Sequence, residues 1–183
     1  MPKVRYGISN LHIFKRTEAD STITYGDVIT IPGTVHITLD PQGNVTPFHA
    51  DNIRYWIGRS NQGYEGELEL ALVLDAIKTA YLGYADATNG NLIETNAQGA
   101  DCAIVFQFET DTESRRAVLY NCQLSRPSRD FNTVEDDVEP ETETLEFTVN
   151  GETVNGVQCF IAEVKPADSN YNTVFTAIAL PTF

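Results

Sequence analysis

An alternation of leucine and glutamate constrains the fold of this chain more than any other feature. Leu68, Leu70 and Leu72 alternate with Glu67 and Glu69. Successive side chains of a β-strand point to opposite faces, so this pattern predicts a strand with an apolar face and an acidic face. We therefore expect a sheet that covers a core with one face and presents carboxylates on the other.

A short helix is expected directly after this strand. Asp75 is predicted to cap its N-terminus, and Gly83 stands where a helix C-terminus favours a residue that adopts positive φ. The apolar stripe of the helix consists of Ile77, Ala80 and Tyr81. The predicted helix is about two turns long.

The remaining segments predict a chain of strands and turns. Strands are expected at residues 6–14, 34–39, 52–58, 102–109, 115–124, 145–149, 158–164 and 174–180. The strand 52–58 carries bulky side chains on both faces, which predicts burial or an interface. About eight to ten strands and one short flanking α-helix predict a single all-β domain over residues 1–183, a β-sandwich or a part-closed barrel.

Several local details of these strands can also be predicted. Val35, Ile37 and Leu39 are expected to face inward from one strand, and Ile104, Phe106 and Phe108 from another. Residues 15–24 are expected to form a flexible arm or loop. Turns are predicted at Asp40-Pro41-Gln42-Gly43, which matches type I, and at Asn89-Gly90, Asn150-Gly151 and Asn155-Gly156.

The composition limits the classes of function. The chain has 12 Lys and Arg against 26 Asp and Glu, a net charge of −14, which disfavours a tight grip on nucleic-acid phosphates. A solvated surface that keeps the chain soluble is the simpler explanation of this charge. Three cysteines without a CxxC spacing predict free thiols in a reducing cytoplasm, with Cys102 and Cys122 as cross-strand neighbours. Neither a signal peptide nor a membrane span is expected.

No pattern of catalytic or metal-ligating residues is present in the sequence. His12, His36 and His49 are scattered, and no nucleophile, phosphate-loop or dinucleotide motif occurs. The acidic stretch 135–143 could attract calcium weakly, but a solvated loop explains it better. We therefore expect no enzyme activity and no cofactor.

The order of elements resembles the major tail tube protein family of long-tailed, non-contractile bacteriophages. The resemblance is carried by His49-Ala50-Asp51-Asn52, the strand 63–74 and its helix ending at Gly83, the hairpin 102–124, and the polar stretch 125–144 before the strand 145–149. It covers residues 1–183. The acidic loop at 135–143 departs from the family's pattern.

This resemblance implies a tail tube fold that assembles into hexameric rings stacked into a tube. In the family, four strands of each subunit line a channel that holds the tape measure protein and later passes DNA without binding it specifically. The corresponding strands here would be 35–46, 65–73, 120–129 and 141–149. The side chains implied to face the lumen are Glu67, Glu69, Gln123, Thr144, Glu146 and Thr148.

The resemblance also implies surfaces of contact and partners. An N-terminal arm, the segment 52–62 and an acidic hairpin tip around 126–143 would join subunits or rings, through Asn52, Arg54, Trp56, Arg59, Glu135, Asp136, Asp137 and Glu139. Besides other copies of itself, the partners would be the tape measure protein and the tail terminator and tail tip proteins. The implied location is the virion, assembled in the host bacterial cytoplasm, without membrane contact.

A stand-alone β-sandwich binding module is the alternative function. Tyr55, Trp56 and Tyr64 could form an aromatic platform for a carbohydrate. Neighbouring residues of a strand point to opposite faces, which weakens this interpretation for Tyr55 and Trp56. An enzyme is the third and least supported class.

Overall fold

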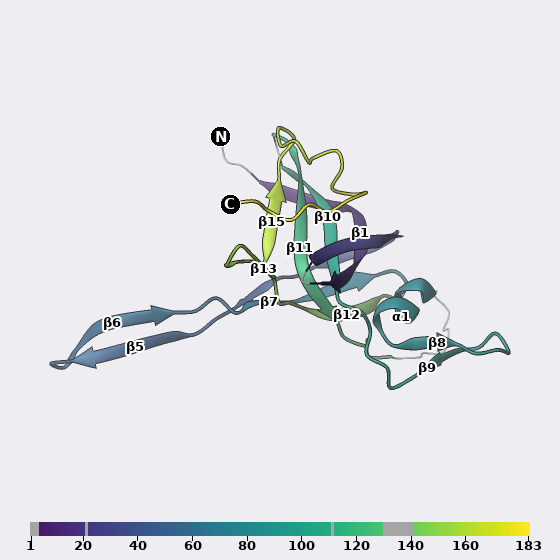
Figure 1. Cartoon of the computed structure of the whole chain (residues 1–183), viewed down its shortest axis with the longest axis horizontal. Helices are drawn as coiled ribbons and strands as arrows, with labels where there is room; N and C mark the ends of the chain where they lie inside the picture. Colours follow the sequence, from purple (N-terminus) through teal and green to yellow (C-terminus); the bar gives the residue numbers. More distant parts are fainter. Residues whose placement is uncertain (1–3, 21, 111, 130–140) are drawn as a thin grey trace, which may run out of the picture.

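The computed structural model describes residues 4–20, 22–110, 112–129 and 141–183. Within these residues the chain is mostly β-structure with one short helix, and the main sheet does not close into a barrel. Figure 1 shows a curved sheet with one long hairpin extending from it. The described strands number fifteen, more than the eight to ten predicted, because several are only three residues long.

Nine antiparallel strands form the main sheet. They are β1 (Arg5–Ala19), β2 (Thr22–Ile31), β3 (Thr34–Ile37), β4 (Asp40–Gln42), β7 (Gly63–Leu70), β10 (Cys102–Thr110), β11 (Ser114–Leu124), β12 (Glu143–Val149) and β15 (Ile161–Val164). Their order is β2-β1-β10-β11-β12-β7-β3, with β15 also paired to β11 and β4 to β7.

Three hairpins lie outside this sheet. They are β5 (Val45–Ala50) with β6 (Ile53–Arg59), β8 (Tyr84–Asp86) with β9 (Leu92–Glu94), and β13 (Glu152–Val154) with β14 (Val157–Cys159). The predicted turn at Asn155-Gly156 is confirmed, since both residues have positive φ, 50° and 80°. Gly90, in the turn between β8 and β9, also has positive φ, 84°, as its Asn-Gly sequence predicts.

The sheet curves around one large apolar core. Leu11 and Ile13 of β1 share this core with Leu68 of β7, Ile104 of β10 and Ile77 of the helix. Strands from both ends of the sheet therefore pack on one another. The predicted shared face of Ile104, Phe106 and Phe108 is confirmed, because all three belong to this core.

A smaller core covers the other face of β1, β10 and β11. Phe14, Val105 and Val118 pack there against Val174 of the C-terminal segment. The strand predicted at 174–180 is wrong. This segment forms turns instead, with Val174 N–H donating to the Asn170 carbonyl, and its apolar side chains fill the small core rather than extend the sheet.

Strand β11 changes its pairing partner along its length. Its first part, Arg116 to Leu119, pairs with β15, and its last three residues, Cys122 to Leu124, pair with β12. Asn121 lies at the change and has a left-handed backbone, with φ of 50°. The sheet therefore forks at Asn121, with one branch toward β15 and the other toward β12, β7, β3 and β4 (Figure 1).

The loop predicted at residues 15–24 is wrong. Strand β1 continues to Ala19 and pairs with β2 from Thr22 onward, through pairs such as Thr17 with Thr24. Asp20, with φ of 49°, makes the turn. The polar composition of the segment hides a hairpin that is fixed by tertiary contacts of Arg16, described below.

The type I turn predicted at residues 40–43 is also wrong. Asp40 pairs with Glu65 and Pro41 with Tyr64, so this segment is strand β4. Proline lacks an N–H group and is tolerated on such an edge strand. Upstream, a register shift between Thr34 and His36 turns Val35 outward, so Val35 is 51% exposed and the prediction that it faces the core is wrong.

The alternation in β7 ends earlier than predicted. Leu68 and Leu70 are fully buried, as predicted, but the strand ends at Leu70 and Leu72 is 60% exposed. Val73 takes the next core position, with 1% exposure. The expected inward orientation of Leu72 is therefore wrong.

Helix α1 (Asp75–Tyr81) follows, and Ile77 and Tyr81 are buried as predicted. Its N-cap is Leu74, without a side-chain hydrogen bond, so the prediction of Asp75 as the cap is wrong. Asp75 is instead the first helical residue and accepts a hydrogen bond from Lys78. Gly83 has φ of 74° just after the helix, as its position in the sequence predicts. Across the described ranges, no helix combines the length and the apolar character that crossing a membrane requires.

Cys102 and Cys122 are paired opposite one another on β10 and β11, which confirms their predicted cross-strand position. Both are fully buried and free. Burial raises the pKa of both thiols above the ordinary value.

Candidate functional site

The outer face of β11, β12, β7 and β4 forms a continuous polar surface, which we call the acidic face. Register places its side chains in rows across the strands. One row contains Gln123, Thr148, Glu65 and Asp40, a second contains Glu146 and Glu67, and a third contains Thr144, Glu69 and His36. Every second residue of these strands points the other way, into the large core.

The structure brings all six sequence-predicted lumen residues onto the acidic face. Glu67, Gln123, Thr144 and Glu146 are exposed, and Glu69 and Thr148 are half-buried. The strand implied at 120–129 is shorter than expected, since β11 ends at Leu124.

Two further carboxylates complete the acidic face. Asp40 was assigned to a turn, although it pairs with Glu65. Glu65 was predicted to form a row of carboxylates with Glu67 and Glu69, although it was not among the six residues implied to face the lumen. The acidic face therefore carries five carboxylates, those of Asp40, Glu65, Glu67, Glu69 and Glu146.

The charge of the acidic face is not neutralised within the described chain. Glu67 and Glu146 stand directly opposite each other on β7 and β12. Glu65 accepts a hydrogen bond from Gln42 Nε2 at 3.0 Å, and Glu69 accepts one from Thr142 Oγ1 at 2.7 Å. Those partners are neutral, and among the described residues no Lys or Arg forms an ion pair with these four glutamates.

Carboxylates placed directly opposite each other destabilise a strand pair by about 0.2–1 kcal/mol. The stability of the single chain therefore does not explain why Glu67 and Glu146 face each other. A function that requires a negative surface would explain it.

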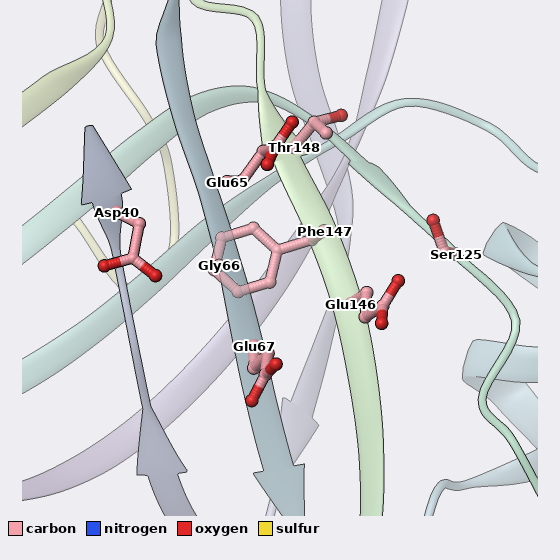
Figure 2. A pocket seen from close by; sticks show the side chains of 8 residues that line it. All are labelled: Asp40, Glu65, Gly66, Glu67, Ser125, Glu146, Phe147 and Thr148. Carbon is pink, nitrogen blue, oxygen red and sulfur yellow. The ribbon is translucent and has the colours of Figure 1, made fainter. Parts of the chain in front are cut away.

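Figure 2 shows a shallow hollow of about 360 Å³ in the acidic face, between β4, β7 and β12. The ring of Phe147 lies against Gly66. A Cβ at Gly66 would meet the Thr38 carbonyl oxygen and, at 2.7 Å, the Phe147 ring, so only glycine fits this position. Carboxylates of Asp40, Glu65, Glu67 and Glu146 surround the hollow.

The hollow offers oxygen acceptors for water. Among the described residues, no group of three or more His, Cys, Asp or Glu side chains could hold a metal ion. The hollow is open and lined by carboxylates, a glycine, a phenylalanine and two hydroxyl groups. Its chemistry is that of a hydrated anionic wall.

The β5–β6 hairpin extends away from the curved sheet (Figure 1). It exposes large apolar side chains, including Phe48 at 57%, Ile53 at 62%, Tyr55 at 71% and Trp56 at 58%. The predicted burial of this strand is therefore absent from the single chain, and the interface remains a prediction. A two-stranded hairpin by itself is marginally stable in water, and clustered exposed apolar side chains are typical of an interaction surface.

Four of the predicted contact residues, Asn52, Arg54, Trp56 and Arg59, lie on this hairpin or in its turn. The other four, Glu135, Asp136, Asp137 and Glu139, lie outside the described residues, as does most of the acidic tip predicted around 126–143.

Arg126 attaches the start of that segment to the region after α1. Its guanidinium donates to the Leu82 carbonyl at 3.1 Å and to the Thr95 carbonyl at 2.6 Å. It also forms an ion pair with Glu94 at 3.0 Å. The chain therefore leaves β11 in a fixed direction beside the acidic face.

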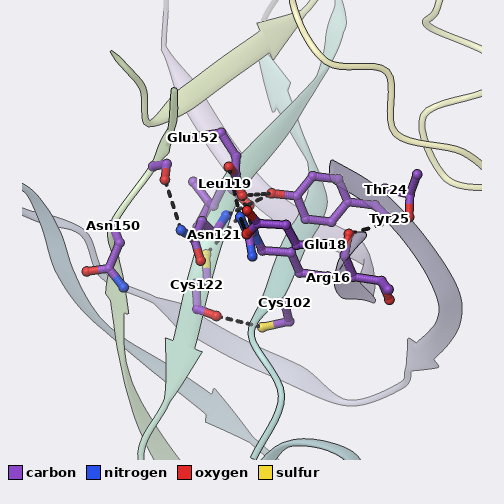
Figure 3. A network of polar contacts seen from close by, with 12 residues as sticks. Arg16, Glu18, Thr24, Tyr25, Cys102, Leu119, Asn121, Cys122, Asn150 and Glu152 are labelled. Atoms are coloured by element: carbon purple, nitrogen blue, oxygen red, sulfur yellow. Dashed lines mark hydrogen bonds and ion pairs between the residues drawn. The ribbon is translucent and has the colours of Figure 1, made fainter. Parts of the chain in front are cut away.

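Figure 3 shows a network of polar contacts among β1, β2, β11 and β13. Glu152, at 2% exposure, forms an ion pair with Arg16 and accepts a hydrogen bond from Tyr25 Oη at 3.0 Å. The hydrogen bond with Glu152 raises the pKa of Arg16, and burial raises the pKa of Tyr25 above the ordinary value. This network joins β13 to the β1–β2 hairpin, and it explains why residues 15–24 are ordered strands.

The aromatic platform of the alternative function is not assembled in this chain. Tyr64 lies at the start of β7 in the main sheet, half-buried and edge-on to Phe160 at 6.4 Å between ring centroids. Tyr55 and Trp56 lie on the extended hairpin. The three rings therefore belong to two separate parts of the molecule.

No protein-family model and no curated protein matches this chain. The acidic face and the exposed hairpin are the features of the described chain that bear on its function.

Proposed function

We propose that this chain is a structural protein of the phage tail tube type, which self-assembles into stacked hexameric rings that form a tube for DNA. The observation that supports this function best is the acidic face: six side chains implied to line a lumen lie on one surface, and its carboxylates have no cationic partner in the described chain.

A wall of this kind suits the passage of DNA. Glu67, Glu69 and Glu146 repel phosphates that come close to the wall. At physiological ionic strength the repulsion is screened over about 8 Å, so it acts near the wall and prevents adhesion without blocking the channel. Gln123, Thr144 and Thr148 keep the rest of this surface hydrated.

The edges of the sheet suit assembly into rings. Strand β2 pairs only with β1, and β3 pairs only with β7, so each leaves one edge unpaired within the described chain. Unpaired edges are ready to bind a strand of another chain. When the β2 edge of one copy meets the β3 edge of the next, two different surfaces are in contact, which makes the interface heterologous. Repeated contacts of this kind close into a ring when the rotation between neighbouring copies permits it.

The proposed partners follow from this assembly. Copies of the chain form the tube, the tape measure protein occupies its lumen before DNA passes, and tail terminator and tail tip proteins bind its two ends. The tube belongs to the virion and is assembled in the cytoplasm of the host bacterium. Its function involves no catalytic step and no cofactor.

Negative-stain electron microscopy of the purified protein, over a range of concentrations, tests this function. We expect rings or tubes with a central channel. The competing function is a binding module for carbohydrate, which predicts monodisperse monomers that bind glycans on an array. Monomers at every concentration, together with glycan binding that Trp56→Ala abolishes, would refute the tube function. They would support the binding module instead.

A further inference from the structure

We infer that the β5–β6 hairpin of one copy docks in an apolar groove between β1, β3, β10 and β15 of the next copy. This inference rests on the proposed function, because it identifies the surface that receives the hairpin in the assembly. The occupant of the groove is thus a second copy of this chain. Three observations carry the argument: the shape of the groove, the reach of the hairpin and the distribution of charge.

The groove has a volume of about 510 Å³, which is within the range of clefts that hold ligand-sized groups. Its floor consists of apolar core residues such as Phe106 and Phe108, and its sides include the exposed Tyr6 and Val35. Arg5 and Glu163, which form an ion pair at 3.3 Å, lie at its polar border. An apolar cleft with a polar border is the usual anatomy of a site that receives aromatic side chains.

The hairpin supplies side chains that suit this groove. Phe48 and Trp56 stand opposite each other across β5 and β6, and both are more than half exposed. Trp and Tyr are enriched among residues that dominate the binding energy of protein interfaces. Tyr55 is the next residue to Trp56 on β6 and points to the opposite face, so Phe48 and Trp56 define the docking face.

The hairpin cannot reach the groove of its own chain. Its base is fixed by backbone hydrogen bonds, from Gln62 N–H to the Gln42 carbonyl and from Ser60 N–H to the Asn44 carbonyl, both near 3 Å. From this base the strands extend away from the sheet (Figure 1). The groove lies in the body of the sheet, between β1 and β3. Docking must therefore occur between copies.

The distribution of charge also favours contact between the hairpin of one copy and the body of another. Arg54 and Arg59 outnumber Asp51 in the hairpin, which therefore carries +1, whereas the rest of the chain carries −15, since the total is −14. Within the described residues, neither Arg54 nor Arg59 forms an ion pair. A weakly cationic hairpin is attracted to an anionic body and is not attracted to a second hairpin.

The resulting contact is heterologous, because the hairpin and the groove are different surfaces. Each copy then has one free hairpin and one free groove at the ends of a growing assembly. Such contacts propagate without limit unless they close into a ring. They provide a route by which one ring adds to another.

Cysteine cross-linking between two variants of the full chain tests the docking. Both variants carry Cys159→Ser, since Cys159 is the half-buried native thiol and the other two are fully buried. One adds Thr46→Cys, an exposed position on the same face of the hairpin as Phe48 and Trp56, and the other adds Val35→Cys at the groove. We expect a covalent heterodimer under mild oxidation when the two are mixed, and none from either variant alone. Val157→Cys, at an exposed valine of β14 outside the groove, is the matched control partner and should remain uncoupled.

The same samples, viewed by negative-stain microscopy, separate this inference from the proposed function. Tubes without the heterodimer, or equal coupling to Val157→Cys, would overturn the docking and leave the tube in place. A heterodimer without rings or tubes would support the docking and overturn the tube. Monomers without any heterodimer would overturn both.

A charge at the groove provides an independent measurement. Val35→Asp should reduce the polymerised fraction about tenfold or more, because the carboxylate would be desolvated by the docked hairpin. The side chain of Val35 is 51% exposed in the single chain, so the monomer should keep its fold by circular dichroism. Val157→Asp should polymerise normally. Equal polymerisation of the two variants would contradict the docking.

Discussion

The opposed carboxylates of Glu67 and Glu146 predict an unusual result: reversing one charge should stabilise the isolated chain. These residues form a directly opposite pair on β12 and β7, with Cβ atoms expected about 5 Å apart. Two like charges about 6 Å apart in water repel by about 0.7 kcal/mol, and screening over about 8 Å reduces this to about 0.3 kcal/mol. Glu65 and Glu69 are diagonal neighbours of Glu146 and add to the repulsion.

We therefore expect Glu146→Gln to raise the free energy of unfolding by about 0.5 kcal/mol and Glu146→Lys to raise it by about 1 kcal/mol, within the range of cross-strand pairs. Urea denaturation followed by circular dichroism measures both. The difference in stability between these proteins should depend on salt, because salt screens repulsion and attraction alike. The free energy of unfolding of the unmodified chain should rise between low and high sodium chloride, and that of Glu146→Lys should not.

Asp86→Asn serves as the control for net charge. Asp86 is exposed on β8 and stands opposite Leu92 rather than a carboxylate. The substitution Asp86→Asn removes the same charge from the chain without separating two opposed carboxylates. The free energy of unfolding should therefore change by less than about 0.3 kcal/mol. If Glu146→Lys is less stable than Glu146→Gln, or if Asp86→Asn gives the same gain as Glu146→Gln, the argument from opposed carboxylates is refuted.

Three further outcomes follow from burial and charge. Leu70→Asp should abolish folding by circular dichroism, since it buries a charge at a fully buried position, whereas Leu72→Asp, at 60% exposure, should fold normally; equal behaviour of the two would contradict the observed end of β7. In a tail tube of the kind proposed above, Glu67→Lys should keep the fold but slow the ejection of DNA, and normal ejection kinetics would count against a lumen position for this residue. Burial raises the pKa of Tyr120 from 10.0 to about 12, so the stability that this group contributes below pH 10 should be lost as the pH rises from 10 toward 12. Urea denaturation over this pH range should show a smaller loss of unfolding free energy in Tyr120→Phe. If Tyr120→Phe loses as much stability over this pH range as the unmodified chain, other groups cause the loss and the prediction for Tyr120 is wrong.

Patterns that depend on neighbouring residues were predictable from the sequence. The alternation around Leu68 and Leu70 identified the core face of β7 and the acidic face together. The hairpin of Cys102 and Cys122 has Ile104, Phe106 and Phe108 on one face of its first arm, an apolar run at 117–120 in its second arm and a polar turn between them. Asn-Gly at residues 155–156 fixed a tight turn because only a few residues adopt positive φ without strain.

Features that depend on distant partners were not predictable. Residues 15–24 look like a polar loop, yet the pair of Arg16 with Glu152 spans 136 residues and fixes them as strands. Asp40 lies in a sequence that favours a turn, and pairing with β7 overrides that local preference. Val174 and its neighbours have the composition of a strand but form turns whose apolar side chains cover the small core, a contact with β1, β10 and β11 that no local pattern indicates.

In the candidate site, too, the features set by neighbouring residues were predictable and those set by distant partners were not. The six side chains implied to face a lumen share one surface because strand alternation determines which face each side chain joins. The exposed hairpin was identified as a contact segment, but its separation from the sheet depends on where β4 and β7 pair, which no local pattern indicates. Asp40 was missed for the same reason, since only its pairing with Glu65 of β7 places it on the acidic face.

The fork at Asn121 has a mechanical consequence. The register pairs from Cys122 with Val149 to Leu124 with Phe147 are continued by backbone hydrogen bonds, from Asn150 N–H to the Asn121 carbonyl and from Ser125 N–H to the Glu146 carbonyl. Beneath this seam both branches of the fork share the large apolar core. A load on the acidic face is therefore passed to β1 and β10 through hydrogen bonds and packing together, and the two branches deform as one body.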